Sequence, residues 1–161
     1  AVARYLYATL NHGTPLYSWS EERGPEPGSP KILGDRQHLW TPIAVLRLLR
    51  DSLVLEEGKN LHLARGADRS WLARGPLGGS GFVTHFGPVG YRLTLAAADR
   101  VTGEVSLTAG RLPEKLAIHV RLPDGRKLAA IDDPAARILP DGETVEWTHP
   151  QPTLRFAATV R

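Results

Sequence analysis

The chain of 161 residues contains no cysteine and no methionine. Without cysteine it has no disulfide, no thiolate nucleophile and no cysteine-ligated zinc, and the compartment in which it works stays unknown. No apolar run approaches the roughly 20 residues that a bilayer-crossing helix needs, so we expect no membrane span. Because the chain opens with neither a basic leader nor a cleavage pattern, and no methionine begins it, we interpret the sequence as a fragment or a processed product.

Charge of one sign is also never concentrated along the chain. The 20 Lys and Arg residues are scattered among 17 Asp and Glu residues, and the formal net charge is +3. No run of five or six like charges occurs, so we expect a solvated surface and no nucleic-acid partner. The shares of hydrophobic residues (42%) and charged residues (23%) are typical of a folded globular domain.

Two helices are expected in the first third of the chain. Residues 1–12 carry apolar side chains at helical spacing, and the Asn-His-Gly at 11–13 is a helix-ending signal. Thr41 and Pro42 supply a hydroxyl N-cap and a proline at the first helical position, which predicts a second helix over 43–53. The apolar stripe of this second helix is broad, so we expect it to be covered on more than one side.

From residue 53 onward the hydrophobic period changes from 3.6 to 2 and turn signals multiply. Residues 53–57 and 60–66 flank a Gly-Lys turn and predict a hairpin, and 116–122 show the cleanest alternation of apolar and polar side chains. Eight or nine short strands at this spacing predict an antiparallel sandwich or barrel. The glycine-rich residues 75–81 lack the strand-then-helix order of a phosphate loop, and we expect a flexible connection there. The predicted fold class is mainly β with N-terminal helices.

A long loop at 16–40 carries a motif at each end. Glycine and proline are crowded in its middle, which prevents a regular element through much of it. It begins with Trp-Ser-Glu-Glu at 19–22 and ends with Gly-Asp-Arg-Gln-His-Leu-Trp at 34–40. A loop of this length in a compact protein is either disordered or functional, and the aromatic and charged residues at its ends favour function.

The two motifs resemble those of glycosidases built on an (α/α)6 barrel, the six-hairpin glycosidases, which include glucoamylases and bacterial rhamnosidase-like and debranching-like proteins. In that family a late loop carries an aromatic residue or Ser followed by Glu. A Gly-Asp-Gly-Gln-His type segment follows a Gly/Pro-rich stretch, and Trp opens the last barrel helix. Residues 53–72 and 84–93 also resemble the barrel-to-sandwich junction of the bacterial members, whereas the strands after about residue 100 match only in general pattern.

The resemblance implies a domain organisation and partners. Residues 1–57 would be the last helical hairpin and a loop of an incomplete (α/α) barrel, and 58–161 an antiparallel β-sandwich. The barrel's remainder would come from a missing N-terminal part of the same protein or from a companion chain. The substrate would be an oligosaccharide, and no cofactor is implied.

The resemblance also assigns site residues. Glu21 would be the catalytic general base, with Glu22 as the adjacent alternative. The substrate-binding candidates would be aromatic platforms and polar groups for sugar hydroxyls, namely Trp19, Asp35, Arg36, His38 and Trp40. The general acid would lie outside this chain, which alone should be inactive, because glycoside hydrolysis needs two carboxyl groups. Arg36 stands where many relatives have Gly, and Glu-Arg follows Glu21, so a different substrate or a decayed site stays open.

Other interpretations remain open beside this one. The chain could be a non-catalytic carbohydrate-binding or structural β-sandwich module whose helices pack on the sheet. Trp40 could be a core anchor, and Glu21 with Glu22 a solvated surface pair. The four histidines of the β region lie on different predicted strands without metal-ligand spacing, and we propose no metal; they are His62, His85, His119 and His149.

Overall fold

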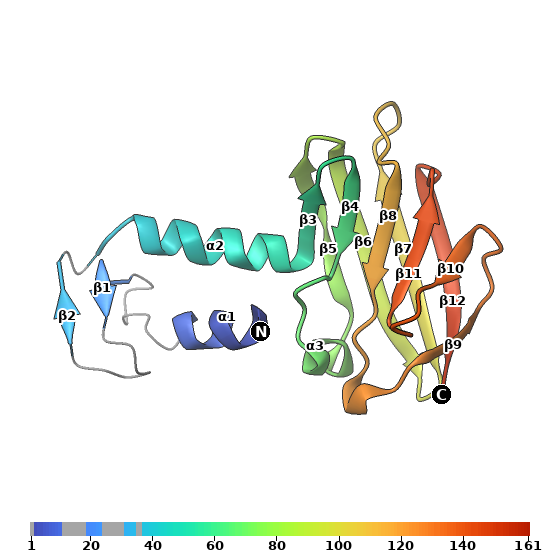
Figure 1. Ribbon diagram of the computed structural model, residues 1–161, viewed down its shortest axis with the longest axis horizontal. Helices are drawn as coiled ribbons and strands as arrows, with labels where there is room; N and C mark the ends of the chain where they lie inside the picture. The colour runs from blue at the N-terminus through green and yellow to red at the C-terminus, as the bar shows by residue number, and fades with distance from the viewer. Residues whose placement is uncertain (1, 11–18, 24–30, 35–36) are drawn as a thin grey trace. The chain divides into compact units, whose positions relative to one another are not determined.

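The computed structural model describes residues 2–10, 19–23, 31–34 and 37–161 (Figure 1). The chain divides into two compact units, Ala1–Ser52 and Leu53–Arg161. No helix within the described residues has the length and apolarity needed to span a bilayer.

The first unit contains two helices and a short strand pair. Helix α1 spans Val2–Leu10 and α2 spans Trp40–Leu53, while strands β1 (Glu22–Arg23) and β2 (Ile32–Leu33) pair antiparallel. Helix α2 begins at Trp40, just before the expected proline-containing turn. Much of its apolar surface is open, since Ile43 is 62% exposed and Leu46 65%. The covering that we expected on more than one side of α2 is therefore not supplied by the described residues.

The second unit is mainly β, as predicted. Its strands form two five-stranded sheets, ordered β10-β11-β8-β4-β3 and β5-β6-β7-β12-β9. Neighbouring strands are antiparallel except β4 and β8, which are parallel. The elements are β3 (Val54–Glu57), β4 (Asn60–Leu63), α3 (Arg69–Arg74), β5 (Leu77–Thr84), β6 (Gly87–Ala97), β7 (Arg100–Leu107), β8 (Lys115–His119), the 3-10 helix η1 (Pro123–Gly125), β9 (Leu128–Ile131), β10 (Ala136–Ile138), β11 (Thr144–Thr148) and β12 (Thr153–Val160).

The predicted hairpin at the start of the β region is confirmed. Strands β3 and β4 pair in the register Val54↔Leu63, and Gly58 takes a φ of 61° in the turn, a conformation that favours glycine. The second unit begins at Leu53 and includes β3, an edge strand of the first-named sheet.

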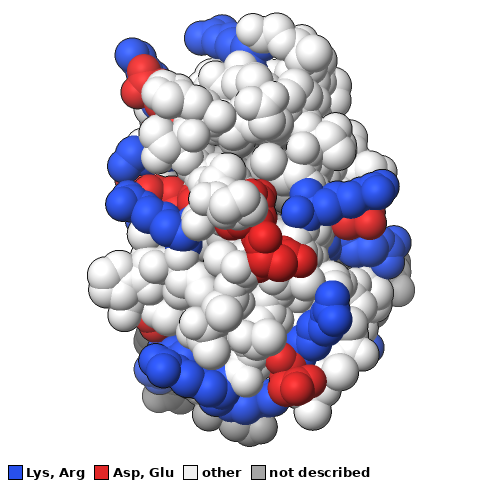
Figure 2. All heavy atoms as spheres, turned by 90° about the vertical axis from the view of Figure 1, so that its right-hand side faces the viewer, with Lys and Arg blue, Asp and Glu red and all other residues white. Residues whose placement is uncertain are grey.

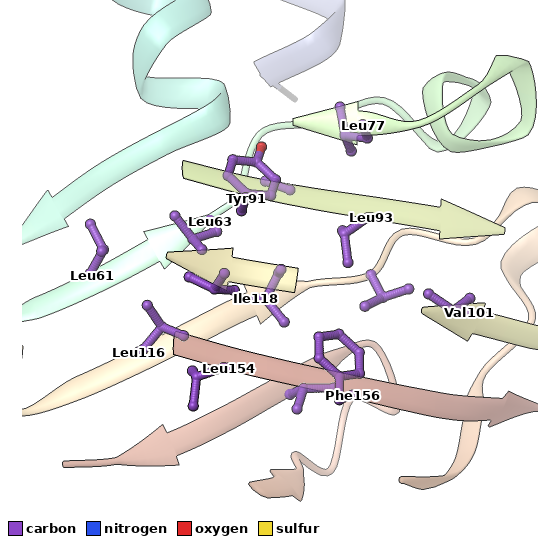
Figure 3. Close-up of a cluster of buried hydrophobic side chains, with 14 of the residues drawn as sticks. Leu61, Leu63, Leu77, Tyr91, Leu93, Val101, Leu116, Ile118, Leu154 and Phe156 are labelled. Atoms are coloured by element: carbon purple, nitrogen blue, oxygen red, sulfur yellow. The ribbon is translucent and has the colours of Figure 1, made fainter. Parts of the chain in front are cut away.

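The core lies between the two sheets, which makes this unit a β-sandwich. Leu116 and Ile118 from β8 belong to the same buried cluster as Leu93 from β6 and Phe156 from β12 (Figure 3). The predicted inward positions of residues 116–122 are confirmed, since every second one is fully buried. Full burial of one such side chain contributes about 1.5–3 kcal/mol relative to an exposed position.

A glycine lets an aromatic side chain enter this core. A Cβ on Gly103 would lie 2.1 Å from Cε1 of Phe156, so β7 accommodates the ring only because position 103 has no side chain. The ring of Phe156 in turn lies 5.4 Å from that of Trp147, which belongs to the opposite sheet. The Trp147 indole is fixed by a hydrogen bond from its Nε1 to Asp133 (2.8 Å).

The expectation of a flexible connection at 75–81 is wrong. Most of this segment belongs to β5, which pairs with β6 from Leu77↔Leu93 to Thr84↔Gly87 and shifts register between Gly79 and Phe82. Glycine weakens a strand, but inward packing of Leu77 and pairing with an eleven-residue neighbour override that local preference.

A buried carboxylate holds α3 at one end of the sandwich. Glu143, 8% exposed, accepts hydrogen bonds from Arg69 (2.7 and 2.9 Å) and Lys127 (2.5 Å). Arg69 also donates to the carbonyl of Leu122 (3.1 Å). Burial alone would raise the pKa of Glu143, but the hydrogen bonds from Lys127 and Arg69 outweigh it and lower that pKa. The carboxylate therefore stays charged and paired.

Candidate functional site

The two ends of the Gly/Pro-rich loop come together in the first unit. The amide of His38 donates to the carbonyl of Trp19 (2.9 Å), and the hydroxyl of Thr41 donates to the carbonyl of Ser20 (3.3 Å). Strands β1 and β2 continue this approach through the Glu22↔Leu33 pair. The motifs that are separated in sequence by the loop thus form one local structure.

Glu21 lies against the second motif. A Cβ on Gly34 would lie 2.1 Å from Oε2 of Glu21, and Gly34 has a φ of +73°. Both the close approach and the backbone conformation require glycine at position 34. The Glu21 side chain is exposed, so its carboxylate is held at the surface beside the glycine that begins the second motif.

The predicted aromatic platforms differ in exposure. Trp19 is half-buried, and its indole Nε1 donates to the carbonyl of Thr9 in α1 (2.7 Å), which gives this ring a structural role. Trp40 is 75% exposed and is therefore not a core anchor within the described structure. Its ring meets that of His38 edge to face, with centroids 5.1 Å apart.

Two buried polar atoms near this arrangement have no hydrogen-bond partner among the described residues. They are Oγ of Ser20 and Nε2 of His38. Asp35 and Arg36 lie outside the described residues, and Glu22 belongs to β1. The structure thus brings Glu21, His38 and Trp40 into one region of the first unit and leaves two predicted substrate-binding residues undescribed.

Among the side chains that the structure describes in this unit, Glu21 is the carboxylate beside the two motifs. Asp51 on α2 is already engaged by Arg50 (3.0 Å) and Arg47 (3.8 Å). Glu21 could activate a water or orient a hydroxyl, but an inverting mechanism needs a second carboxyl about 6.5–9.5 Å away. The described side chains of this unit therefore do not by themselves supply the pair of carboxyl groups that hydrolysis requires.

The sequence did not predict a second cluster, in which two histidines contact each other on the outer face of the second unit. Nδ1 of His62 lies 3.3 Å from Nε2 of His119, whose Nδ1 lies 3.1 Å from the hydroxyl of Thr144. That hydroxyl donates to Oδ2 of Asp141 (2.6 Å). At the other end, Nε2 of His62 lies 3.1 Å from Oε2 of Glu57. We call these five residues the histidine chain.

Asp141, at one end of the histidine chain, sets the direction of the hydrogen bonds along it. Because ionised Asp141 only accepts, Thr144 donates to it, and His119 must donate from Nδ1 to Thr144. Neutral His119 then has a bare Nε2, which accepts from Nδ1 of His62. This leaves Nε2 of neutral His62 without a proton 3.1 Å from the Glu57 carboxylate, so the contact is attractive only when Nε2 is also protonated and His62 is charged.

Burial opposes a positive charge on either imidazole. It lowers the pKa of His119 to about 4, with further lowering by His62 and Arg121, while Asp141 acts in the opposite direction. Burial and Arg65 also lower the pKa of His62, against Glu57 and Glu146. The two imidazoles are therefore neutral around pH 7, and they titrate as a coupled pair.

Sequence reasoning missed the histidine chain because β4 and β8 are far apart in sequence and pair in parallel. The register His62↔Ala117 places His119 one outward position further along β8. An outward-facing histidine on each of two strands was the available signal, but nothing local predicts which strands are neighbours. The described residues hold no group of three or more histidines and carboxylates placed to bind a metal ion.

A third feature is a groove of about 530 Å³ on the outer face of the sheet that contains β5, β6, β7 and β12. We call it the glycine groove. Its lining includes Gly79, Gly90, Arg92, Glu104, Ser106 and Arg155. None of the histidine-chain residues lines it, so the two features are separate.

The described residues thus form a helical unit and a two-sheet β-sandwich, with an exposed carboxylate-aromatic cluster in the first and an open groove on the second. Comparison with known proteins finds no match: no protein-family model, no curated protein and no solved structure is similar to this chain.

Proposed function

We propose that this chain is the C-terminal part of an (α/α)6-barrel glycoside hydrolase, to which it contributes a general-base loop, the last barrel hairpin and an accessory sandwich. The observation that carries the proposal is the approach of the two loop motifs. Glu21 lies against Gly34, and His38 is hydrogen-bonded to Trp19 beside the exposed ring of Trp40. This is the set of residues that the resemblance relates to the base side of a sugar site.

The open apolar surface of the helices supports the same proposal. Leu39, Ile43 and Leu46 are all more than half exposed at or near the start of α2, and Tyr5 is likewise exposed on α1. Apolar side chains gathered on one element in this way are typical of an interaction surface. In the proposed parent, further barrel helices cover them.

The proposed chemistry assigns Glu21 the removal of a proton from the attacking water. The general acid that protonates the leaving oxygen belongs to another barrel loop, so both halves are needed for turnover. Trp40 offers a flat apolar ring to the C–H face of a sugar, and the ring of His38 lies next to it, where it can bond a sugar hydroxyl.

The test is hydrolysis of a panel of aryl glycosides by the longer product that contains this chain. Glu21→Gln should lower kcat by about 10²–10⁴-fold, because a general base contributes on that scale. Glu22→Gln is the matched control, since it makes the same chemical change one residue away and should keep most of the activity. Equal activity of wild type and Glu21→Gln would exclude the assigned role, and a larger loss in Glu22→Gln would move the role to Glu22.

A second candidate function is a non-catalytic carbohydrate-binding module. The glycine groove favours it, because an open groove on a sheet face suits an extended ligand without any reactive carboxylate pair. Binding of glycans by the 161-residue chain, with no hydrolysis by any longer product, would favour this candidate over the first.

A further inference from the structure

The glycine groove exists because small residues line the floor of a sheet face. Gly79 and Gly90 occupy neighbouring strands, and a Cβ on Gly90 would lie 2.8 Å from Oγ of Ser106. An ordinary strand residue at position 90 would fill the space above that hydroxyl. The floor of the groove therefore consists of backbone and one serine.

One wall is a row of charges that runs across three strands. The sheet register places Arg92 opposite Glu104, and Glu104 opposite Arg155. Two arginines and one glutamate leave this row with a charge of +1. Arg155 contacts Glu104 at only 3.8 Å, and both side chains are largely exposed, so their pairing contributes little. No described residue forms a hydrogen bond or ion pair with Arg92, and its guanidinium is available to a ligand.

The hydrogen-bonding groups of the groove restrict the chemistry of a ligand. A guanidinium only donates, an ionised glutamate only accepts, and the hydroxyls of Ser80, Ser106 and Thr153 do both. A ligand that satisfies all of them carries an anionic group for the arginines and hydrogen-bond donors for Glu104. An acidic sugar offers both, because its ring hydroxyls donate beside its carboxylate or sulfate group. An acidic peptide is the competing occupant, with backbone N–H donors spaced further apart along the chain.

The groove provides no aromatic platform for an uncharged sugar. Tyr91 is the one aromatic residue in its lining, and its ring is turned to the core, where the residue is 4% exposed. On the side of the molecule that Figure 2 shows, cationic and anionic side chains are interspersed. Within the groove, the charged side chains are those of Arg92, Glu104 and Arg155, so charge selectivity comes from this row.

We infer that the glycine groove binds a chain of acidic sugars, with Arg92 and Arg155 contacting a carboxylate or sulfate group and Glu104 accepting from neighbouring hydroxyls. The groove crosses four strands, which at about 4.8 Å between strands spans roughly 14 Å, and it is open rather than enclosed, as an extended ligand requires. The inference names the substrate class that the accessory sandwich holds, and in that respect it rests on the proposed function.

The test is calorimetric titration of the 161-residue chain with three oligosaccharides of equal length: an oligogalacturonate, a sulfated oligosaccharide and a neutral malto-oligosaccharide. We expect at least one acidic oligosaccharide to bind and the neutral one not to. The two acidic probes distinguish carboxylate from sulfate. Arg92→Ala should weaken binding about tenfold or more, which is the loss expected for hydrogen bonds to a charged group.

Two further variants make the titration decisive. Ser106→Ile fills the floor without changing charge and should abolish binding, while Arg100→Ala removes the same charge from β7 outside the groove and should leave binding unchanged. Equal binding of the neutral sugar, equal binding of poly-glutamate, or equal losses in Arg92→Ala and Arg100→Ala would each overturn the inference. Hydrolysis by the longer product plays no part in this titration, so its failure leaves the role of Glu21 untouched, and the reverse also holds.

Discussion

At the residue scale, a single missing side chain makes room for an aromatic ring in the core between the sheets. Gly103 has no positive φ to explain it, so its role is the space it leaves for Phe156. The sequence pattern TGEVSL predicts only a strand with a weak position. That a ring from β12 occupies the space above this glycine depends on the register Phe156↔Gly103, which is a property of the assembled sheet.

We therefore predict that Gly103→Ala lowers the free energy of unfolding by about 1–3 kcal/mol, the usual cost of overpacking a core. The measurement is urea denaturation, and the control is the same substitution in a Phe156→Leu background. Leu lacks the ring atoms nearest to the new methyl group, so the alanine should cost much less there. An equal cost in both backgrounds would show that contact with Phe156 is not the cause.

At the element scale, the histidine chain links strands β4, β8 and β11 through side chains on their outer face. His119 is neutral in the folded state because burial lowers its pKa to about 4, below an unfolded value of 6.5. The folded state therefore binds fewer protons than the unfolded state between these pH values. Stability is complete above about pH 6.5 and declines as the pH falls toward 4.

This direction gives a measurable pH dependence. Between pH 7 and pH 5 the wild-type chain should lose about 2 kcal/mol of unfolding free energy through His119, and His119→Gln should lack that part of the loss. Urea midpoints at the two pH values provide the measurement. Identical pH slopes for the two proteins would contradict the neutral, buried state that we assign to His119.

The elements also show where local patterns are sufficient. The hairpin of β3 and β4 was predictable because its alternation, its Gly-Lys turn and its short separation all lie within eleven residues. The glycines of β5 misled the prediction, since local propensity is weak there and pairing with β6 decides the structure. The residues of one loop motif do not show which other segment they contact. The resemblance to glycosidase loops was what related Glu21 to residues 34–40.

At the scale of the whole molecule, the two units differ in how completely they bury their apolar residues. The buried cluster of the sandwich is formed entirely by residues from Val54 to Ala158. Among the described residues of the first unit, several large apolar side chains of α1 and α2 are exposed, and the buried hydrophobic ones are Leu6 and Val45.

We expect residues 53–161 expressed alone to unfold in one cooperative urea transition, because the buried cluster of this unit is formed by its own residues, Val54 to Ala158. Its midpoint should lie close to that of the main transition of the 161-residue chain. Circular dichroism and tryptophan fluorescence should report the same transition. Non-coincident transitions, or binding of a hydrophobic dye in the absence of urea, would show that the sandwich depends on residues 1–52.

The sequence by itself determined the class of each region, because the change of hydrophobic period from 3.6 to 2 near residue 53 is a local property of the chain. It also determined that carboxylate, histidine and tryptophan side chains stand at the two ends of the Gly/Pro-rich loop. The tertiary structure alone decided the parallel contact of β4 with β8, which brings His62 to His119, and the alignment of Arg92, Glu104 and Arg155 across three strands. Strand order and register come from the packing of two complete sheets, which no single segment encodes.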